Sequence, residues 1–289
     1  MEAGGMAVIS NSVTTLRTQQ VVQAAVRALY DEMCLYPKPG LVSKIDNGSH
    51  DDMTPASFVK SLFSLRHFFS AIYRAGTRDA CFAELVQLGL TAEARMLRAT
   101  AGINTHRGAI FNLGLLCATL GKADVSDHRV DLPQLLIDSW GDDIKAADSR
   151  NSSNSNGSIV CRQYAVGGAR GEAAAGFPHV FKIGLPAIIA VRNAGGNDTA
   201  ARCQAFFAIM AALEDTNLLH RGGAHGLHYA RTAALSFLAD GGVFTLDWQQ
   251  RAAQIHHEFI ARRLSPGGTA DMLAATLFID GLSERSIAV

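Results

Sequence analysis

Apolar residues recur at intervals of three and four along most of the chain, which is the spacing of one face of an α-helix. The first such face lies between Leu16 and Met33 and ends before Pro37, because proline cannot continue a helix. Thr54-Pro55 has the form of a cap followed by a first-turn proline. The pattern predicts further helices over residues 55–72, 80–99, 105–121, 131–144, 159–177, 198–214, 223–239, 246–264 and 269–282.

Alternating patterns typical of β-strands are almost absent. The β-prone run Val243-Phe244-Thr245-Leu246 is too short to build a sheet, and no fixed-period repeat indicates a solenoid. The segment "DSRNSSNSNGS" over residues 148–158 is polar and low in complexity, which predicts a mobile loop near the middle of the chain. We therefore predict an all-α protein, a single large multi-helix globular domain over residues 1–289.

Composition narrows the class of protein. The 289 residues carry zero formal net charge, with 48% apolar and 18% charged residues, and no basic run of the kind that binds nucleic acid. No segment approaches the ~18 consecutive apolar residues of a membrane-spanning helix, and the start of the chain does not have the form of a signal peptide. Five scattered cysteines form no Cys-x-x-Cys pair, which is typical of reduced thiols. We expect a cytoplasmic protein that binds neither nucleic acid nor a membrane.

Six polar clusters interrupt the helical pattern, and most of them join glycine to acids, bases or amides. They fall almost entirely at predicted helix ends, where backbone N–H groups and the helix dipole favour anions and glycine lets a ligand approach the backbone. We therefore expect an active site formed by glycine-rich loops at helix ends. The clusters cover residues 37–40, 50–53, 104–108, 168–172, 215–223 and 265–271.

The clusters and their neighbours supply two kinds of charged group. Basic side chains would bind phosphate oxygens through point or bidentate contacts, and these are Lys38, Lys44, Arg107, Arg170 and Arg221. Carboxylates could hold a hard cation such as Mg²⁺, which prefers oxygen ligands together with substrate phosphates. These carboxylates are Asp52, Glu172, Asp215 and Asp271.

Simpler interpretations exist for several of these residues. Asn104 or Thr105 is explained equally well as the cap of the helix that follows, and Thr54 and Asp131 are explained as caps alone. The run Ser265-Pro266-Gly267-Gly268, taken alone, is more typical of a turn than of a phosphate loop. The case for function therefore depends on the number of clusters. The histidines without a pattern of partners are interpreted as ordinary: His67, His128, His179, His256 and His257.

Three other histidines indicate a different function. His225 and His228 are three residues apart and would share a helix face, a spacing usable for a transition metal, and His220 precedes them. With the doublet His50-Asp51 they suggest a helical metal-dependent nucleotide phosphohydrolase. That class needs a histidine upstream of the doublet, and none precedes His50. The doublet also lies before a predicted cap and not within a helix. This function is kept as the alternative.

The clusters, in their order along the chain, resemble the triphosphoribosyl-dephospho-coenzyme A synthase family. The matching strings are "PKPGLV", "GSHDDM", "GINTHRGAIFNLGLL", "GARGEAAAGFP", "DTNLLHRGG" and "SPGGTADMLA", between Pro37 and Ala274. Their form and the length of the chain are most similar to the branch that serves malonate decarboxylase, and less to the citrate lyase branch. Arg107 stands where the family more often has lysine, which keeps the charge and changes the donor geometry.

The resemblance implies an enzyme that transfers the 5-triphosphoribosyl group of ATP to the 2′-hydroxyl of 3′-dephospho-coenzyme A and releases adenine. Mg²⁺ is the expected cofactor, and ATP is a substrate. The product would become the prosthetic group of the acyl carrier protein of malonate decarboxylase, attached by a separate phosphoribosyl-dephospho-coenzyme A transferase. The surplus of apolar residues leaves room for a homodimer.

This reaction lets each cluster residue be given a hypothetical role. Cleavage of an N-glycosidic bond builds positive charge on the sugar, and the acceptor hydroxyl needs a general base. We predict Asp215, or failing that Glu172, as the base, and His106 beside the triphosphate or as the proton donor to adenine. Asp52 and Asp271 would bind Mg²⁺ or the sugar hydroxyls. The predicted substrate-binding residues are Lys38, Gly40, Lys44, Asn104, Thr105, Arg107, Gly108, Arg170, Asn217, Arg221, Gly222, Gly223, Ser265, Gly267 and Gly268.

Overall fold

Helices dominate the secondary structure of the computed structural model, which describes residues 3–126, 130–150 and 156–283. No strand occurs in these residues, so the predicted all-α fold is confirmed. In chain order the elements are α1 (Ala3–Cys34), α2 (Pro55–Ser64), α3 (Arg66–Thr77), α4 (Phe82–Ala99), α5 (Arg107–Ala123), α6 (Leu132–Leu136), the π-helix η1 (Ile137–Gly141), α7 (Asp142–Arg150), α8 (Asn156–Tyr164), α9 (Gly168–Ala174), the π-helix η2 (His179–Gly184), α10 (Leu185–Asn193), α11 (Asp198–Ala212), α12 (Thr216–Ala239), the 3₁₀ turn η3 (Gly242–Phe244), α13 (Trp248–Ala261) and α14 (Gly267–Ser283).

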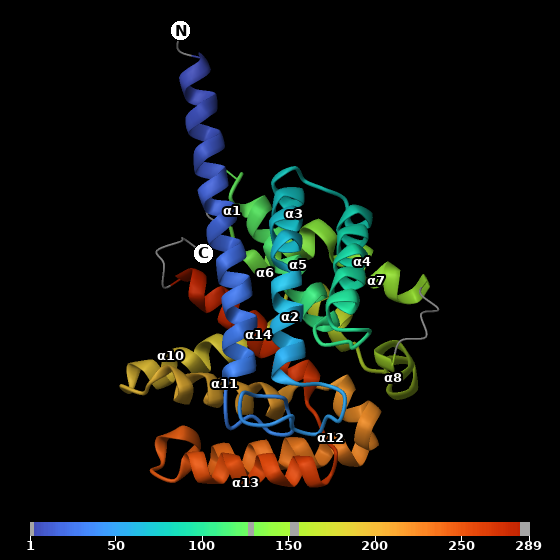
Figure 1. The fold of residues 1–289 in the computed structure, drawn as a ribbon, viewed down its shortest axis with the longest axis vertical. Helices are drawn as coiled ribbons and strands as arrows, with labels where there is room; N and C mark the ends of the chain where they lie inside the picture. Colours follow the sequence, from blue (N-terminus) through green and yellow to red (C-terminus); the bar gives the residue numbers. More distant parts are fainter. Residues whose placement is uncertain (1–2, 127–129, 151–155, 284–289) are drawn as a thin grey trace.

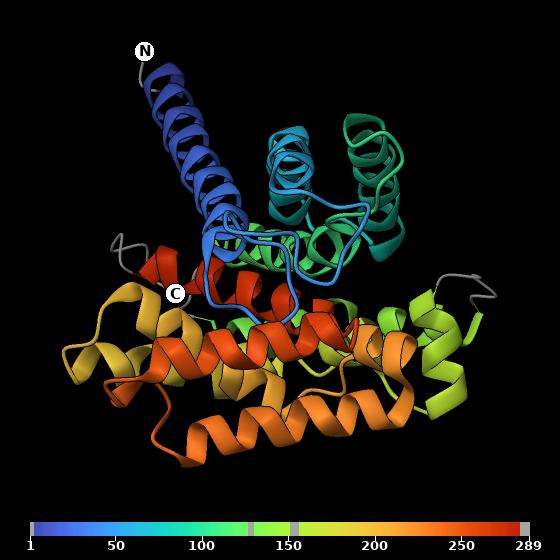
Figure 2. The same ribbon diagram turned by 60° about the horizontal axis from the view of Figure 1, so that its bottom comes forward.

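The helices are arranged around a central pair, α5 and α14. Figures 1 and 2 show α1, α2–α3 and α4 standing side by side above this pair, while α10 to α13 lie below it. Helix α14 packs against α1, α5 and α11, and its side chains are buried from Met272 to Ile279. One buried apolar cluster extends from Val21 to Leu282, so the central pair is held from both sides.

Two glycines allow α3 and α5 to approach closely. A Cβ atom on Gly76 would lie 1.9 Å from the carbonyl oxygen of Ala118, and one on Gly121 would lie 2.1 Å from that of Tyr73. Any larger residue would therefore push the two backbones apart. This contact fixes the position of α5, whose N-terminal end carries the "GINTHRGAIF" motif.

Local signals explain several of the helix starts. Thr54 forms a capping box with Ser57 and is followed by Pro55, so its role as a cap is confirmed. Asp131 occupies the N-cap position of α6 without a side-chain cap bond. The helix predicted over 55–72 divides at Leu65 into α2 and α3. Apolar residues on both sides of the break are buried, so the apolar spacing did not reveal it.

The mobile loop predicted near residues 148–158 is wrong at both of its ends. Helix α7 continues to Arg150 and α8 begins at Asn156, while residues 151–155 lie outside the described residues. Polar side chains such as Ser and Asn weaken a helix only slightly when it can still bury one face, and Val160 of α8 is buried.

The second half of the chain differs from prediction at three further places. The helix expected over 159–177 is divided into α8, which ends at Tyr164, and α9, and these are followed by η2 and α10, which the spacing did not predict. Helix α12 begins at Thr216 and not at Gly223, where it is kinked with φ 60° and ψ −161°. The β-prone run near Phe244 begins within the 3₁₀ turn. Glycine tolerates a positive φ, as at Gly223. The spacing of apolar residues gives no indication of such a backbone conformation.

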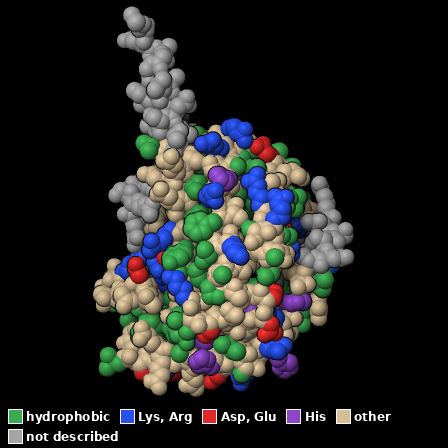
Figure 3. Space-filling view, in the orientation of Figure 1, with side chains coloured by type: hydrophobic (Ala, Val, Ile, Leu, Met, Phe, Trp, Pro, Cys, Tyr) green, Lys and Arg blue, Asp and Glu red, His purple; other side chains and the backbone are tan. Residues whose placement is uncertain are grey.

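Two surface properties bear on partners. On the face drawn in Figure 3, the described Lys and Arg side chains form several separate groups with apolar and neutral side chains between them. In the described parts of the chain, no single helix is long and apolar enough to cross a membrane, and one bent pair, Gly168–Ala174 with His179–Asn193, passes that test by length and composition only.

Candidate active site

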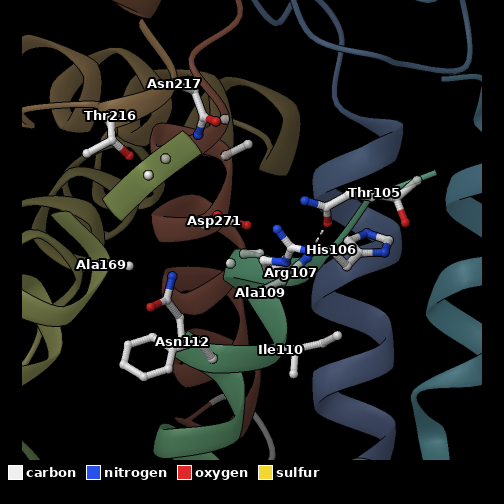
Figure 4. Close-up of a pocket in the computed structure, with 18 of the residues that line it drawn as sticks. Thr105, His106, Arg107, Ala109, Ile110, Asn112, Ala169, Thr216, Asn217 and Asp271 are labelled. Atoms are coloured by element: carbon white, nitrogen blue, oxygen red, sulfur yellow. Dashed lines mark hydrogen bonds between the residues drawn. The ribbon is translucent and has the colours of Figure 1, made fainter. Parts of the chain in front are cut away.

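A cavity of about 1570 Å³ opens between the upper helices and the central pair, and Figure 4 shows part of its wall. Sites for a single small ligand usually measure about 300–1,000 Å³, so this cavity has room for two nucleotide-sized molecules. All six polar clusters contribute to it. The predicted site residues that line it are Lys38, Asp52, Asn104, Thr105, His106, Arg107, Gly108, Arg170, Glu172, Asp215, Asn217, Arg221, Ser265, Gly267, Gly268 and Asp271.

Four predicted substrate-binding residues do not line the cavity: Gly40, Lys44, Gly222 and Gly223. A Cβ atom on Gly40 would lie 2.1 Å from the carbonyl oxygen of Leu264, and one on Gly222 would lie 2.7 Å from a methyl group of the same residue. Gly223 forms the kink in α12. These glycines are explained by close packing and backbone conformation, and their prediction as substrate-binding residues gains no support.

Lys44 lies outside the cavity and has a partner of its own. Its ammonium group donates a hydrogen bond of 2.8 Å to the Tyr30 hydroxyl and lies 4.6 Å from the centre of the Tyr30 ring. The predicted contact between Lys44 and phosphate therefore gains no support from the cavity.

Asp215 is buried at the start of α12 and joins that helix to α14. Its Oδ1 accepts hydrogen bonds from the backbone N–H groups of Asn217 and Leu218, at 2.9 and 3.2 Å. Its Oδ2 accepts from the backbone N–H and the hydroxyl of Thr269, at 2.7 and 2.9 Å. Burial raises the pKa of this carboxyl, and the hydrogen bonds act in the opposite direction. Four donors occupy the carboxylate, which leaves little of it for a substrate proton.

Asp271 lies at the start of α14 and lines the cavity opposite the first turn of α5. Gly108 makes this approach possible, because a Cβ atom there would lie 1.9 Å from Oδ2 of Asp271. The backbone N–H of Ala109 donates a hydrogen bond to the carboxylate. Burial, followed by the negative charges of Glu32 and Asp215, raises the pKa of Asp271 well above its usual value. A cavity carboxylate with a raised pKa is typical of a general base.

Lys38 is buried against Glu32, a second acid of the cavity wall. Its ammonium nitrogen contacts Oε1 of Glu32 at 2.5 Å and the carbonyl oxygen of the same residue at 2.7 Å. Lys38 is only 1% exposed and lines the cavity. A buried cation of this kind is tolerated because its partner neutralises it, and the pair places one positive and one negative group at the cavity wall.

His106 precedes the first turn of α5 and is almost fully buried. Its Nδ1 lies 2.6 Å from the Ser61 hydroxyl, and its ring packs edge-on against Phe58. Burial, with a smaller contribution from the charge of Lys38, lowers the pKa of His106 to about 3. The imidazole is therefore neutral at physiological pH, which limits it to hydrogen bonding through its free Nε2. The backbone N–H that opens the helix is taken by Asn104, whose Oδ1 accepts from Arg107 at 3.2 Å.

The three cavity arginines differ in their surroundings. Arg107 forms an ion pair with Glu93, and Arg170 donates to the carbonyl oxygen of Ala147. Arg221 contacts the carbonyl oxygens of Ser49 and Arg263, both at 3.2 Å, and Nδ1 of His50 at 3.1 Å. Within the described part of the chain no carboxylate pairs with Arg221 at salt-bridge distance, so its charge is available to an anionic ligand.

Glu172 projects from α9 into the cavity and is held by the start of η2. Its Oε1 accepts a hydrogen bond of 2.8 Å from the backbone N–H of His179, and its Oε2 lies 2.7 Å from Nδ1 of that histidine. His179, interpreted from the sequence as ordinary, therefore orients a cavity carboxylate. A carboxylate bound to one histidine retains lone pairs for a further contact.

His256 is the residue that sequence reasoning most clearly missed. It lies in α13, is fully buried, and connects the loop over residues 35–54 to the lower helices. Its Nδ1 lies 2.8 Å from the carbonyl oxygen of Lys38 and 3.2 Å from the backbone nitrogen of Gly40, and its Nε2 lies 3.0 Å from the carboxylate of Asp46. The Ser49 hydroxyl adds a bond of 2.6 Å to the carbonyl oxygen of Leu264. No sequence signal marks His256, because its partners are more than 200 residues away.

Several buried polar atoms in the cavity wall have no partner. Among the described residues these are Oγ1 of Thr105, Nε2 of His106 and both amide atoms of Asn112, while the other two buried unpaired atoms, Nε of Arg202 and of Arg231, lie outside the cavity lining. Burying such a group unpaired costs about 1–3 kcal/mol. Their concentration in one wall indicates that a polar ligand pairs with them.

The carboxylates predicted to hold Mg²⁺ do not form a metal cage. In the described ranges no group of three or more His, Cys, Asp or Glu side chains is placed to bind a metal ion. Asp52 is largely exposed, with Oδ1 3.9 Å from Nδ1 of His50, and the carboxylate of Asp271, on α14, packs against Gly108 in the first turn of α5. Asp52 and Asp271 fit Mg²⁺ only where substrate phosphates supply most of its ligands, which is the usual mode for this ion.

The histidine-based alternative is not supported. His225 and His228 are exposed on α12 and do not line the cavity, and the kink at Gly223 separates them from His220. His50 contacts Ser265 and Arg221. The side chains in the described ranges therefore lack the ligand cluster that a metal-dependent phosphohydrolase requires.

The amino-acid sequence of the chain is similar to a family of known proteins. Residues 18–288 match the family described as ATP:dephospho-CoA triphosphoribosyl transferase. A protein of Acinetobacter calcoaceticus is 38% identical over 87% of both chains, and it carries the name "Probable 2-(5''-triphosphoribosyl)-3'-dephosphocoenzyme-A synthase". Proteins with the same name from Stutzerimonas stutzeri and Pseudomonas aeruginosa are 40% and 39% identical, over 93% and 97% of this chain and 94% and 98% of their own length. No solved structure matches.

Proposed function

The chain belongs to the ATP:dephospho-CoA triphosphoribosyl transferase family, and from this premise we propose that it is the enzyme that transfers the 5-triphosphoribosyl group of ATP to the 2′-hydroxyl of 3′-dephospho-coenzyme A. The proposal rests above all on one observation: six polar clusters, far apart in the sequence, line a single cavity large enough for both substrates. The names of its relatives agree with this reaction.

The proposed reaction forms one bond and breaks one. The 2′-oxygen of dephospho-coenzyme A attacks C1′ of the ATP ribose, and the electron pair of the bond from C1′ to N9 leaves with adenine. The hydroxyl proton passes to a general base on the enzyme, and the departing adenine acquires a proton. Charge develops on the sugar, as in glycoside hydrolysis, so nearby carboxylates stabilise the transition state.

We assign the general base to Asp271 in preference to Asp215. The carboxylate of Asp271 faces the cavity, and its desolvated position favours proton uptake. Asp215, the base predicted from the sequence, already accepts four hydrogen bonds and acts in this proposal as a positioning residue for α12 and α14. Glu172, the second sequence candidate, would face the sugar or its hydroxyl groups.

The anionic parts of the substrates require positive groups. The helix dipoles of α5, α12 and α14 are directed towards the cavity from their N-terminal ends, whose residues line it. Arg221, Arg107 and Arg170 would bind phosphate oxygens, with Arg221 the most available. Asp52 would help to hold Mg²⁺, which would supply positive charge to offset the charge of the substrate phosphates. Neutral His106 would donate a hydrogen bond and not a full proton.

Adenine release tests this function directly. The protein is incubated with ATP, Mg²⁺ and dephospho-coenzyme A, and adenine is followed by chromatography. We expect adenine to form only when the acceptor is present, and to be matched by an equal amount of the triphosphoribosylated product in the mass spectrum. Release of inorganic phosphate without adenine would instead support the phosphohydrolase. Nucleotide binding without turnover would contradict both enzymatic functions.

The biological setting follows from the same proposal. The product would supply the prosthetic group of the malonate decarboxylase acyl carrier protein through a phosphoribosyl-dephospho-coenzyme A transferase, in the cytoplasm. The enzyme would act as a homodimer. Incubating the product with that transferase and each candidate carrier protein, followed by mass spectrometry of the carrier, would distinguish malonate decarboxylase from citrate lyase. Light scattering would give the number of subunits.

A further inference from the structure

Asn112 is a buried amide for which neither the fold nor the assigned reaction gives a role. It lies on the second turn of α5, is 1% exposed, and lines the cavity. Among the residues that the structure describes, neither its Nδ2 nor its Oδ1 has a hydrogen-bond partner. A buried amide without partners destabilises a protein, and so a residue of this kind is expected to pair with something that the free protein lacks.

The position of Asn112 relates it to the reacting groups. Gly108 precedes it by four residues on α5, so both face the same side of that helix. Gly108 is also the residue against which the carboxylate of Asp271 packs. In Figure 4 the amide of Asn112 projects from α5 towards the hollow bounded by Ala169 and Asp271. A group paired with Asn112 therefore lies within reach of the proposed base.

The surroundings of Asn112 indicate what kind of group this is. Leu115, one turn further along α5, and Ala169, towards which the amide projects in Figure 4, are apolar and line the same cavity. The cavity arginines, in contrast, come from the first turn of α5 and from α9 and α12. A planar, uncharged group with one hydrogen-bonding edge suits an amide on a helix with apolar neighbours, whereas a phosphate suits the arginines.

We propose that Asn112 is a specificity-determining residue that reads the edge of a substrate adenine. Its Nδ2 donates to N7 and its Oδ1 accepts from the N6 amino group, the bidentate pattern by which asparagine distinguishes adenine from other bases. Both proposed substrates carry adenine, and the shared chemistry is this edge. If the base is that of ATP, the bond to N7 also stabilises negative charge as adenine departs.

The inference rests on the proposed function for the identity of the substrates, and its test is a binding measurement that needs no turnover. Calorimetry compares ATP with inosine triphosphate, and dephospho-coenzyme A with its hypoxanthine analogue, because hypoxanthine lacks the amino donor. For wild type we expect one of the two pairs to differ in Kd by about tenfold to a hundredfold. In Asn112→Leu, which keeps the side-chain shape, that ratio falls to about one.

The two pairs of ligands identify which adenine is read, and either answer supports the proposal. A matched control is Thr119→Val, which removes a buried polar group from the same helix seven residues later, outside the cavity lining. This variant keeps the wild-type ratio. Asn112→Ala provides a second substitution if the leucine packs poorly.

The melting temperature of Asn112→Leu distinguishes the proposed role of Asn112 from a purely structural one. Because the amide is unpaired in the free protein, Asn112→Leu leaves the melting temperature unchanged or raises it, while an amide needed for folding would lower it. The proposal is overturned if both base preferences survive in the Asn112 variants, or if wild type shows neither preference. Absence of adenine release by wild type would count against the proposed function alone, since the binding ratios are measured independently.

Discussion

Asp271 and Asp215 show how two carboxylates in one cavity can differ in role. Asp215 accepts hydrogen bonds from four donors, whereas Asp271 faces the cavity and is flanked by the negative charges of Glu32 and Asp215. Hydrogen bonds stabilise the ionised form of a carboxylate, while desolvation and like charges make it more basic. The number of hydrogen-bond donors to each carboxylate depends on the fold. It therefore distinguishes Asp215, which has a structural role, from Asp271, the proposed base.

Removing the proposed base should lower the turnover rate strongly and leave the binding of ATP almost unchanged. We expect Asp271→Asn to lower kcat for adenine release by about 10²- to 10⁴-fold, the usual contribution of a general base, with the Kd for ATP changed little. Single-turnover kinetics and calorimetry measure the two quantities. Near-normal turnover in this variant would contradict the assignment of Asp271.

Gly108 allows the same assignment to be tested with the carboxylate left intact. A methyl group at this position would lie 1.9 Å from Oδ2 of Asp271, so Gly108→Ala should displace that group and reduce kcat while the helix remains formed. Gly281→Ala in α14 is the matched control, because a Cβ atom there meets no atom of the described residues within 4 Å. We expect full activity in the control, and full activity in Gly108→Ala would show that the close contact is dispensable.

His106 should make the protein sensitive to acid. Its pKa is about 3 in the folded protein and about 6.5 in an unfolded chain, so between these values the unfolded chain binds more protons and stability falls as the pH falls. We expect the free energy of unfolding to lose about 1.4 kcal/mol per pH unit below about 6 from this residue. The raised pKa values of Asp215 and Asp271 act with the opposite sign. Denaturant unfolding of wild type and His106→Gln isolates the difference, and parallel curves would contradict it.

At the scale of elements, the site is built from helix starts. The beginnings of α5, α12 and α14 face one cavity. Those of α5 and α14 carry glycine, and at each of the three a side chain caps the helix or contacts a neighbouring one. Asn104 receives the first N–H of α5, and Asp215 serves both α12 and α14. The residues expected to bind substrate and those that cap helices are thus partly the same, which the sequence left as alternatives.

The double role of Asp215 predicts a larger loss of stability than an ordinary cap. Thr54→Ala, at the start of α2 outside the cavity lining, should cost about 1 kcal/mol and leave adenine release unchanged. Asp215→Asn should lower the free energy of unfolding by more than this. The amide nitrogen of asparagine cannot accept the two hydrogen bonds that one of the carboxylate oxygens accepts. It should also retain far more turnover than Asp271→Asn. Urea unfolding and the adenine assay measure both, and the reverse order of activities would restore Asp215 as the base.

At the scale of the whole molecule, the loop over residues 35–54 closes one side of the cavity. It carries Lys38 and Asp52, and it is held by His256 and by the turn before α14. His256 lies outside the cavity lining, but its Nδ1 lies 2.8 Å from the carbonyl oxygen of Lys38, so it helps to determine where these residues lie. The site therefore depends on contacts between the beginning and the end of the chain.

Loss of His256 should loosen this loop. We expect His256→Ala to lower stability by about 1–3 kcal/mol, because the partners Gly40 and Asp46 lose a buried hydrogen-bond group, and to raise KM for the substrates. Limited proteolysis should cut the loop faster. The adjacent His257→Ala is the control, since His257 is exposed. Equal effects of the two substitutions would show that the contacts of His256 with the loop are unimportant.

The sequence by itself determined the helical class and the six clusters, because helical periodicity and glycine-rich helix starts are local properties. It also placed most helix ends within a few residues. It failed at 148–158, at η2 and α10, and at the kink in α12. At these places burial or a positive φ outweighs the local pattern.

Only the tertiary structure decided what each cluster residue contacts. The sequence predicted Asp215 as the base and Asp271 as a ligand of Mg²⁺ or the sugar, yet donors from α12 and Thr269 occupy Asp215 and a glycine on α5 makes room for Asp271. Lys44 is basic and near a cluster, but its partner is Tyr30, while neither His256 nor Asn112 was among the site residues predicted from the sequence. Hydrogen bonding and desolvation depend on residues brought together from distant parts of the chain, and these determine which acid can act as a base.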